Sequence, residues 1–200
     1  MQTATHRASH AAALTEPDLR VALRVHLGDK MADDACLVEE LSIEGGAARV
    51  DVAVIGSRLE AFEIKSDRDS FARLHNQIHA YNRTFDRITL VTGPAFAAAA
   101  LEVMPSWWGV LAGARGDDGV PVFQCLRAAR DNPRQEARSL AMFLWREEAA
   151  AALENRAGRP VAQRRTRSEL QAALAQMLEV DELRAYVTRC LRQRAAVPTT

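Results

Sequence analysis

The spacing of apolar residues changes part of the way along the chain and divides the sequence into two regions. Up to about residue 130, short β-branched or alternating runs are interspersed with amphipathic segments, whereas from about Pro133 onward apolar residues recur only at helical spacing. The pattern predicts an α/β core over residues 15–130 and an all-helical extension over residues 131–200. Residues 1–14 show neither pattern and are expected to form a flexible tail.

Local signals place helices and strands within these regions. Thr15 and Asp18 form a capping box, which predicts that a helix begins there. The run 35–43 suits a strand or a helix, and we favour a strand. Further strands are expected at residues 48–55, 59–66, 87–93, 108–114 and 121–128. Helices are expected at residues 15–28, 66–85, 94–104, 134–155, 166–178 and 181–194, the last with Asp181 as its N-cap.

Three charged residues, Asp51, Glu63 and Lys65, interrupt the apolar strands on either side of the turn Gly56-Ser57-Arg58. Side chains alternate between the faces of a strand, so these charges lie opposite to the faces that carry the valines and Phe62. A three-residue loop keeps apolar residues paired with each other. The pairs that it predicts are Ile55–Leu59, Val52–Phe62, Val50–Ile64 and Asp51–Glu63, with Val50, Val52 and Val54 sharing one face.

This register places the carboxylates of Asp51 and Glu63 directly across from each other. Like charges at about 5 Å destabilise a sheet by roughly 3 kcal/mol at an effective dielectric constant of about 20. A divalent cation between them reverses the sign of that interaction, and oxygen ligands suit Mg²⁺, with Mn²⁺ as a substitute. The alternative is a solvated polar face in which the three residues form ordinary ion pairs.

Lysine is rare in this chain, which strengthens the case that Lys65 has a specific role. Of the 26 basic residues, 24 are Arg and two are Lys, Lys30 and Lys65. Lys65 shares a face with Glu63, two residues before it. A compact ammonium at this position can orient an attacking water molecule or stabilise negative charge on a phosphate.

Composition narrows the class of protein. Hydrophobic residues make up 48%, which is enough for a folded core, and the formal net charge is zero, so bulk charge does not indicate a nucleic-acid partner. No segment has the roughly 18 apolar residues of a membrane helix, and the N-terminus has no apolar signal region. The three cysteines form no zinc pair or disulfide framework. We therefore expect a cytoplasmic protein without membrane contact.

At these residues the sequence resembles the PD-(D/E)xK nuclease superfamily, which has a restriction-endonuclease-like fold. The match is Asp51 followed by Glu63-Ile64-Lys65, although Val50 replaces the proline of the name. Within the superfamily, residues 15–195 resemble a small uncharacterised bacterial group named after a locus tag. The resemblance implies a mixed central sheet flanked by helices, with Asp51 and Glu63 as metal ligands and Lys65 as a catalytic residue.

The resemblance also implies roles for residues outside this motif. Members of the superfamily often carry an upstream Glu, which Glu40 or Glu39 supplies here; we favour Glu40 as an additional metal ligand and catalytic residue. Many also carry a Gln on the following helix and a Tyr one turn later. Gln77 matches the Gln and is expected to be catalytic, and Tyr81 matches the Tyr and is expected to face the nucleic acid.

Contacts to DNA phosphates are expected from arginines outside the acidic centre. Arg73 lies four residues before Gln77, so the two share a helix face that either lines the cleft or is simply solvated. The segment 156–167 carries five arginines and no acid. We expect it to be a flexible basic strap in which Arg164, Arg165 and Arg167 contact phosphates, the alternative being a solvated loop.

Together these features predict a metal-dependent nuclease, with Mg²⁺ as cofactor and DNA as the expected substrate. The rival hypothesis is a non-catalytic nucleic-acid-binding or interaction module that keeps the nuclease fold. A partner protein or a second copy of the chain is expected to dock on the C-terminal helices. The sequence leaves open DNA versus RNA, endonuclease versus exonuclease action, and the biological pathway.

Overall fold

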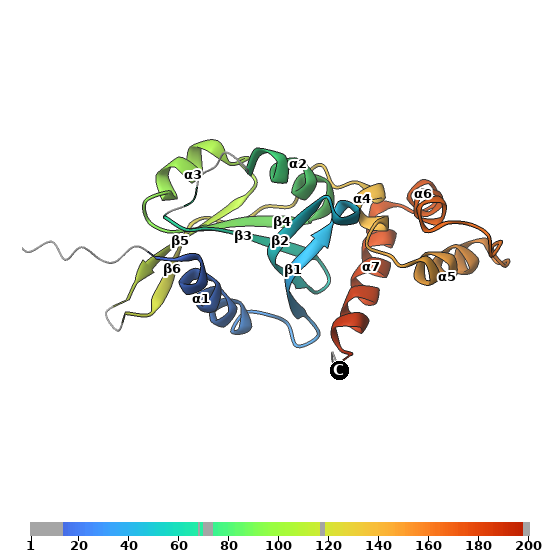
Figure 1. The fold of residues 1–200 in the computed structure, drawn as a ribbon, viewed down its shortest axis with the longest axis horizontal. Helices are drawn as coiled ribbons and strands as arrows, with labels where there is room; N and C mark the ends of the chain where they lie inside the picture. The colour runs from blue at the N-terminus through green and yellow to red at the C-terminus, as the bar shows by residue number, and fades with distance from the viewer. Residues whose placement is uncertain (1–13, 68, 70–73, 117–118, 198–200) are drawn as a thin grey trace, which may run out of the picture.

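A mixed six-stranded sheet forms the centre of the protein (Figure 1). The computed structural model describes residues 14–67, 69, 74–116 and 119–197. The strands lie in sequence order, and the β3–β4 and β4–β5 pairs are parallel whereas the others are antiparallel. The strands are β1 Cys36–Ile43, β2 Ala48–Ile55, β3 Leu59–Lys65, β4 Arg87–Thr92, β5 Gly109–Arg115 and β6 Pro121–Arg127. The predicted α/β class and the strand over residues 35–43 are thereby confirmed.

Helices cover both faces of this sheet. Parallel neighbours need crossover connections, and the usual right-handed crossover places successive helices on the same face. Here α2 (Leu74–Thr84) and α3 (Ala97–Val103) connect the parallel strands and lie on one side, whereas α1 (Glu16–Gly28) lies on the other (Figure 1). The short 3-10 helix η1 (Glu44–Gly46) connects β1 to β2.

The helix α1 begins as its sequence predicts, at an N-cap Thr15 that forms a capping box with Asp18. Its buried leucines, spaced by four residues, pack on β3 and β6. They belong to the smaller of two hydrophobic cores, which we call the second core and whose largest side chains include Leu19, Leu23 and Phe62. Leu14 is also buried in this core, so it does not belong to the predicted flexible tail. The rest of the predicted tail, residues 1–13, lies outside the described residues.

The predicted helix over residues 134–155 is wrong in one respect, because the structure divides it into two. Helix α4 (Ala137–Ala141) ends before residues 142–145, and α5 (Arg146–Ala157) starts after them. Arg167 donates to the carbonyl oxygens of Met142 at 2.8 Å and Leu144 at 2.9 Å, so a distant side chain satisfies carbonyls that a continuous helix would have used.

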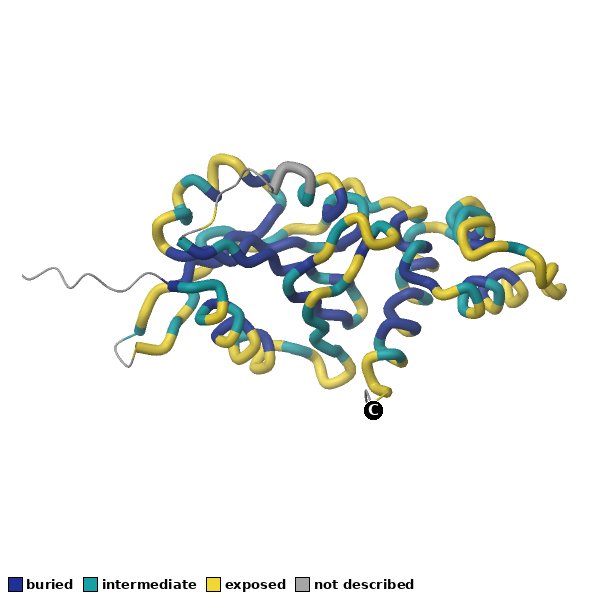
Figure 2. The backbone as a smooth tube through the Cα atoms, viewed as in Figure 1, coloured by how far each residue is buried: buried dark blue, intermediate teal, exposed yellow. Residues whose placement is uncertain are grey.

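Two further helices complete the extension, α6 (Arg167–Met177) and α7 (Val180–Ala195). Helix α7 begins two residues earlier than expected, with Glu179 rather than Asp181 as its N-cap. The extension is not separate from the sheet: Leu140, Leu183 and Val187 share the first core with Ile55 of β2. Figure 2 shows this continuity as buried positions running from the strands into α7.

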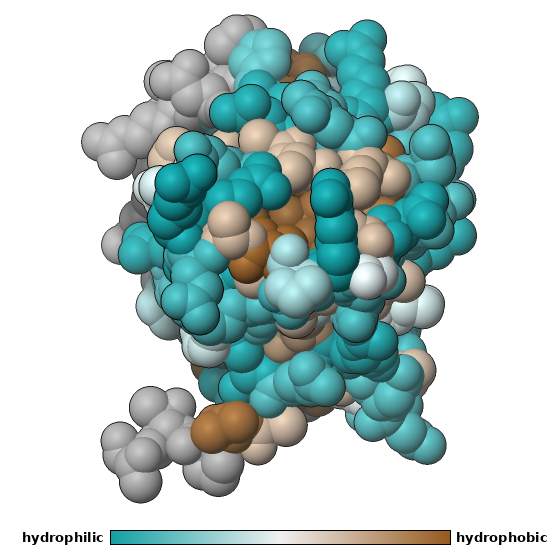
Figure 3. Space-filling model, turned by 90° about the vertical axis from the view of Figure 1, so that its right-hand side faces the viewer, coloured by the Kyte–Doolittle hydropathy of each residue, from teal (hydrophilic) through white to brown (hydrophobic). Residues whose placement is uncertain are grey.

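The helical end of the molecule exposes some apolar surface. Figure 3 looks onto this end and shows apolar side chains in a hollow ringed by hydrophilic ones. In the same helical part, a pocket of about 300 Å³ between α5 and α7 is lined by Ala152, Leu178 and Tyr186 among others. Docking of a partner on these helices stays a prediction. None of the described helices is both long and apolar enough to span a membrane.

Candidate active site

A cavity of about 790 Å³ opens at the carboxyl end of β3. Strand β3 carries its acidic and basic side chains to this edge, while α1 borders the cavity from one face of the sheet and α2 from the other. Four of the predicted site residues line it together: Asp51, Glu63, Lys65 and Gln77. We call it the active-site cavity.

The predicted β2–β3 register is confirmed from Ile55–Leu59 back to Val52–Phe62. Strand pairing ends there, before Asp51. The Asp51 carboxylate instead accepts a hydrogen bond from the backbone N–H of Ile64 at 2.7 Å, so a side chain replaces the next step of the ladder. The predicted direct opposition of Asp51 and Glu63 is therefore corrected: both border one cavity without being a ladder pair.

The alternation of faces also breaks at this point. Val50 packs in the first core with Ile55, whereas Val52 packs in the second core, so the prediction that the valines share a face is wrong for Val50. On β1, Glu39 pairs with Val52 and Leu41 pairs with Val50. The ladder between β1 and β2 skips the residue that lies between Glu39 and Leu41.

The skipped position on β1 is Glu40, whose backbone has a φ of 54°. This left-handed conformation costs a residue with a side chain about 1–2 kcal/mol. It allows two consecutive side chains, Glu39 and Glu40, to reach the same guanidinium, that of Arg20. Strain of this kind persists where the surroundings fix it, and here ion pairs do so.

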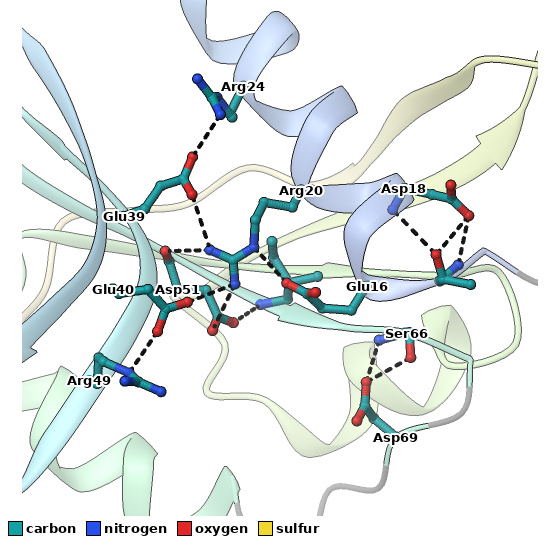
Figure 4. A network of polar contacts seen from close by, with 12 residues as sticks. Glu16, Asp18, Arg20, Arg24, Glu39, Glu40, Arg49, Asp51, Ser66 and Asp69 are labelled. Atoms are coloured by element: carbon teal, nitrogen blue, oxygen red, sulfur yellow. Dashed lines mark hydrogen bonds and ion pairs between the residues drawn. The ribbon is translucent and has the colours of Figure 1, made fainter.

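Arg20 lies at the centre of the acidic residues, as Figure 4 shows. It comes from α1, and its side chain is only 19% exposed. Its contacts are Glu16 at 2.6 Å, Glu40 at 2.9 Å, the Asp51 carbonyl at 3.1 Å, the Asp51 carboxylate at 3.5 Å and Glu39 at 3.7 Å. Sequence reasoning missed this residue, because only the docking of α1 on the sheet brings it to Asp51.

Glu63 is the most buried acidic residue of the site, at 1% exposure. Lys65 Nζ lies 2.7 Å from Glu63 Oε1, and the Tyr81 hydroxyl lies 2.6 Å from Oε2. The Tyr81 hydroxyl is also 2.7 Å from the Arg49 carbonyl oxygen. Hydrogen-bonded partners on both carboxylate oxygens offset the cost of burying this charge.

Tyr81 does not have the role predicted for it. It is fully buried in the first core, and its hydroxyl contacts Glu63 and the chain itself, so it is not available to nucleic acid. Burial, followed by the nearby Glu63 carboxylate, raises the pKa of Tyr81. The phenol therefore stays protonated and acts as a donor that positions Glu63.

Gln77 contributes an unusual acceptor. Its amide oxygen is buried and has no hydrogen-bond partner within the described part of the chain. Buried polar atoms are rarely left in this state, so a bound water molecule, ion or substrate donor is the expected partner. Gln77 lines the active-site cavity, which gives such a partner access to it.

The donor set fits a divalent cation bound by two carboxylates. Both oxygens of Glu40 are ion-paired, one with Arg20 and the other with Arg49 at 2.6 Å, which argues against Glu40 as a metal ligand. Among the described residues, no three His, Cys, Asp or Glu side chains converge on one point. Asp51 and Glu63 remain, and Mg²⁺ commonly uses one or two carboxylates with water and substrate phosphate.

The electrostatics of Asp51 give a testable pH dependence. Burial, and secondly the Glu63 carboxylate, raise the pKa of Asp51 to about 6, against the opposing effects of the Ile64 N–H, Arg20 and Lys65. Because the folded protein holds this proton more tightly than the unfolded chain, its free energy of unfolding should fall as the pH rises from about 4 to about 6. The total change should be at most about 3 kcal/mol.

The measurement is denaturant unfolding at pH 4 to 7 without divalent ions. Asp51→Asn should flatten this part of the profile. Asp181→Asn, at an 85% exposed position on α7, is the matched control and should leave it unchanged. An equally steep profile in Asp51→Asn would assign the titration to another group.

Of the predicted DNA-contacting arginines, the three on the α5–α6 connection and α6 do not line this cavity. Arg73 lies outside the described residues. Arg165 donates to the Glu169 carbonyl at 3.1 Å, and Arg167 is hydrogen-bonded to the end of α4, so these two are anchored rather than free on a flexible strap. Arg164 is exposed. The α5–α6 connection that carries it lies at the end of the molecule away from α1 (Figure 1).

The chain is similar to a curated phage protein over part of its length, and it also aligns with a solved structure. Protein cII of Enterobacteria phage P4 is 34% identical over 99 residues, which are 49% of this chain and 38% of that protein. The chain thus spans under two fifths of that curated relative. A solved structure of a protein of unknown function from Silicibacter pomeroyi aligns with 92% of this chain and 91% of its own, with 18% identity and a TM-score of 0.40.

A family model extends over nearly the whole chain. It is described as bacteriophage P4 protein cII, and it matches residues 9–197, which include both the sheet and the helical extension. The chain therefore belongs to the bacteriophage P4 protein cII family.

Proposed function

We propose that the protein is a metal-dependent nuclease that hydrolyses phosphodiester bonds in DNA and that its sheet is a restriction-endonuclease-like core. One observation carries the proposal: Asp51, Glu63 and Lys65, from neighbouring strands, border a single cavity. Glu63 is a buried carboxylate beside a lysine, and Asp51 is a second carboxyl whose pKa is raised. Such an arrangement is typical of functional sites.

In this proposal, Asp51 and Glu63 would hold Mg²⁺, or Mn²⁺ in its place. When bound, the ion would stabilise negative charge on the phosphoryl group and lower the pKa of coordinated water. Lys65 keeps one N–H on Glu63 and has two others for the attacking water or a phosphate oxygen. Gln77 offers its unpaired amide oxygen to orient a donor in the cavity.

A second candidate function rests on Arg20. Its guanidinium already supplies a positive charge among the carboxylates of Glu16, Glu40 and Asp51. This arrangement suits a non-catalytic nucleic-acid-binding module in which an arginine neutralises the acidic cluster in place of a metal ion. The two functions differ in whether DNA is cleaved and whether divalent ions bind at Asp51.

The test incubates the full chain with labelled single- and double-stranded DNA and RNA, with Mg²⁺, Mn²⁺ or EDTA. We expect DNA cleavage with either ion, none with EDTA, and a loss of at least about 100-fold in Asp51→Asn. Mn²⁺ should also raise the melting temperature of the wild type but not of Asp51→Asn, with Asp181→Asn as the matched control. DNA binding that is unchanged by EDTA, without cleavage, would favour the binding module, and indifference to both ions in calorimetry would exclude the metal site.

A further inference from the structure

A second cavity lies on the α1 face of the sheet, beside the carboxyl end of α1, whose His26 and Leu27 help to line it. Its volume is about 490 Å³, within the roughly 300–1,000 Å³ of small-molecule sites. Val54, Phe62 and Leu111 line it together with Glu60, Arg58 and Arg87. We call it the second cavity; none of its lining residues borders the active-site cavity.

The apolar side of the second cavity is an incompletely covered part of the second core. Val54, Phe62 and Leu111 each keep 7–8% exposure, whereas Val52 and Val91 of the same core keep none. The difference shows which part of the sheet surface α1 leaves incompletely covered. A flat apolar surface on a sheet suits the face of a planar ring.

The polar side of this cavity includes a carboxylate in an unusual place. Glu60 lies in the central strand β3, on the same face as Phe62, and pairs in register with Val54 on one side and Arg87 on the other. Burial raises the pKa of Glu60, and Arg87 and Arg58 oppose that shift. No hydrogen bond or ion pair within the described ranges holds its carboxylate.

The two arginines are fixed at the rim. Asp131 forms ion pairs with both, with Arg58 Nη1 and with Arg87 Nε, the latter at 2.8 Å. Their side chains are 40% and 36% exposed, so the remaining N–H groups of each guanidinium face solvent or the cavity. Two oriented guanidinium groups are a preferred arrangement for binding phosphate.

We propose that the second cavity binds a nucleotide, with the base on Val54, Phe62 and Leu111, base N–H groups donating to Glu60, and the phosphates on Arg58 and Arg87. The assignment follows from the placement of the charges. Glu60 would repel an anion, so it must meet the donor-bearing end of the ligand, and the arginines at the rim meet the anionic end. The proposal is independent of the proposed nuclease function, because the two cavities share no residue.

The test is isothermal titration calorimetry of the full chain in EDTA, which removes metal-dependent binding at Asp51. The probes are the four common ribonucleoside triphosphates, the matching nucleosides and inorganic triphosphate. At least one nucleoside triphosphate should bind at least about tenfold more tightly than its nucleoside or inorganic triphosphate. Arg58→Ala and Arg87→Ala should each weaken it by about tenfold, whereas Arg134→Ala, an exposed arginine outside the cavity, should have no effect.

Glu60→Gln provides the sharper variant, because it preserves shape and removes the charge. Nucleotide binding should weaken by several-fold, while any binding of inorganic triphosphate should stay equal or become tighter. Tighter nucleotide binding in Glu60→Gln would mean that the carboxylate only repels the phosphates and would overturn the placement of the base. The proposal also fails if no triphosphate binds at millimolar concentration, or if inorganic triphosphate binds as tightly as the nucleotides. Melting temperatures of all variants confirm folding.

Discussion

Replacement of Lys65 by Arg is expected to lower DNA hydrolysis by at least about 100-fold while the protein remains folded. The ammonium lies 2.7 Å from Glu63 Oε1, and the lysine side chain is 15% exposed, so the position is closely surrounded. A planar guanidinium keeps the charge but needs more space and places its N–H groups elsewhere. The substitution therefore tests position rather than charge.

The other lysine of the chain, Lys30, provides the matched control. Lys30→Arg makes the same exchange at an exposed position, where the ammonium contacts His26, and should leave hydrolysis unchanged. Single-turnover cleavage at saturating DNA separates a loss in the chemical step from a loss in binding. If Lys65→Arg cleaves DNA within a few-fold of the wild type, Lys65 is only a partner for the charge of Glu63.

Short-range patterns in the sequence predicted much of the site. The alternation of apolar residues on both sides of a three-residue turn gave the correct register from Ile55–Leu59 to Val52–Phe62. The same alternation placed Glu63 and Lys65 on one face, and they form an ion pair there. These features depend on a period of two and on neighbouring residues, both of which are visible in the sequence.

Features that depend on distant contacts were missed. Arg20 reaches Asp51, 31 residues away, only because α1 docks on the sheet, and its presence leaves the predicted ligand Glu40 in ion pairs. The apolar spacing of this helix, with Ile78 and Tyr81 on one stripe, already favours a buried Tyr81, and it was the resemblance that assigned Tyr81 to nucleic acid; the structure buries it. The break after α4 requires Arg167, 25 residues beyond Met142.

The distortion of β1 and β2 also has a non-local cause. Nothing in the sequence around Glu40 marks it for a left-handed backbone, since such positions favour Gly and Asn. The conformation depends on Arg20 and Arg49, which hold the two oxygens of Glu40. The strain, the break in strand pairing at Asp51 and the insertion of Arg20 are thus parts of one arrangement that forms only when α1 and the sheet come together.

Removal of Arg20 should be the most destabilising single change at this site. Arg20→Ala leaves the carboxylates of Glu16, Glu40 and Asp51 close together without their shared cation. We expect the free energy of unfolding at pH 7 to fall by about 3 kcal/mol, near the lower end for breaking a buried pair because several partners are partly exposed. Arg24→Ala is the matched control: Arg24 also lies on α1 and pairs with Glu39 at 3.3 Å, but it is 62% exposed, so its loss should cost less than about 1 kcal/mol.

The origin of the loss can be identified by restoring charge balance in two ways. Arg20 lowers the pKa of Asp51, so its removal moves that pKa upward from about 6, and the deficit in stability should shrink as the pH falls from 7 toward 4. Mn²⁺ should raise the melting temperature of Arg20→Ala more than that of the wild type, because the ion replaces the missing positive charge. Denaturant unfolding at several pH values and thermal melts with and without Mn²⁺ measure both effects. A deficit that is the same at every pH and unaffected by Mn²⁺ would show that Arg20 stabilises the protein by packing between α1 and β1 rather than by neutralising the acidic cluster.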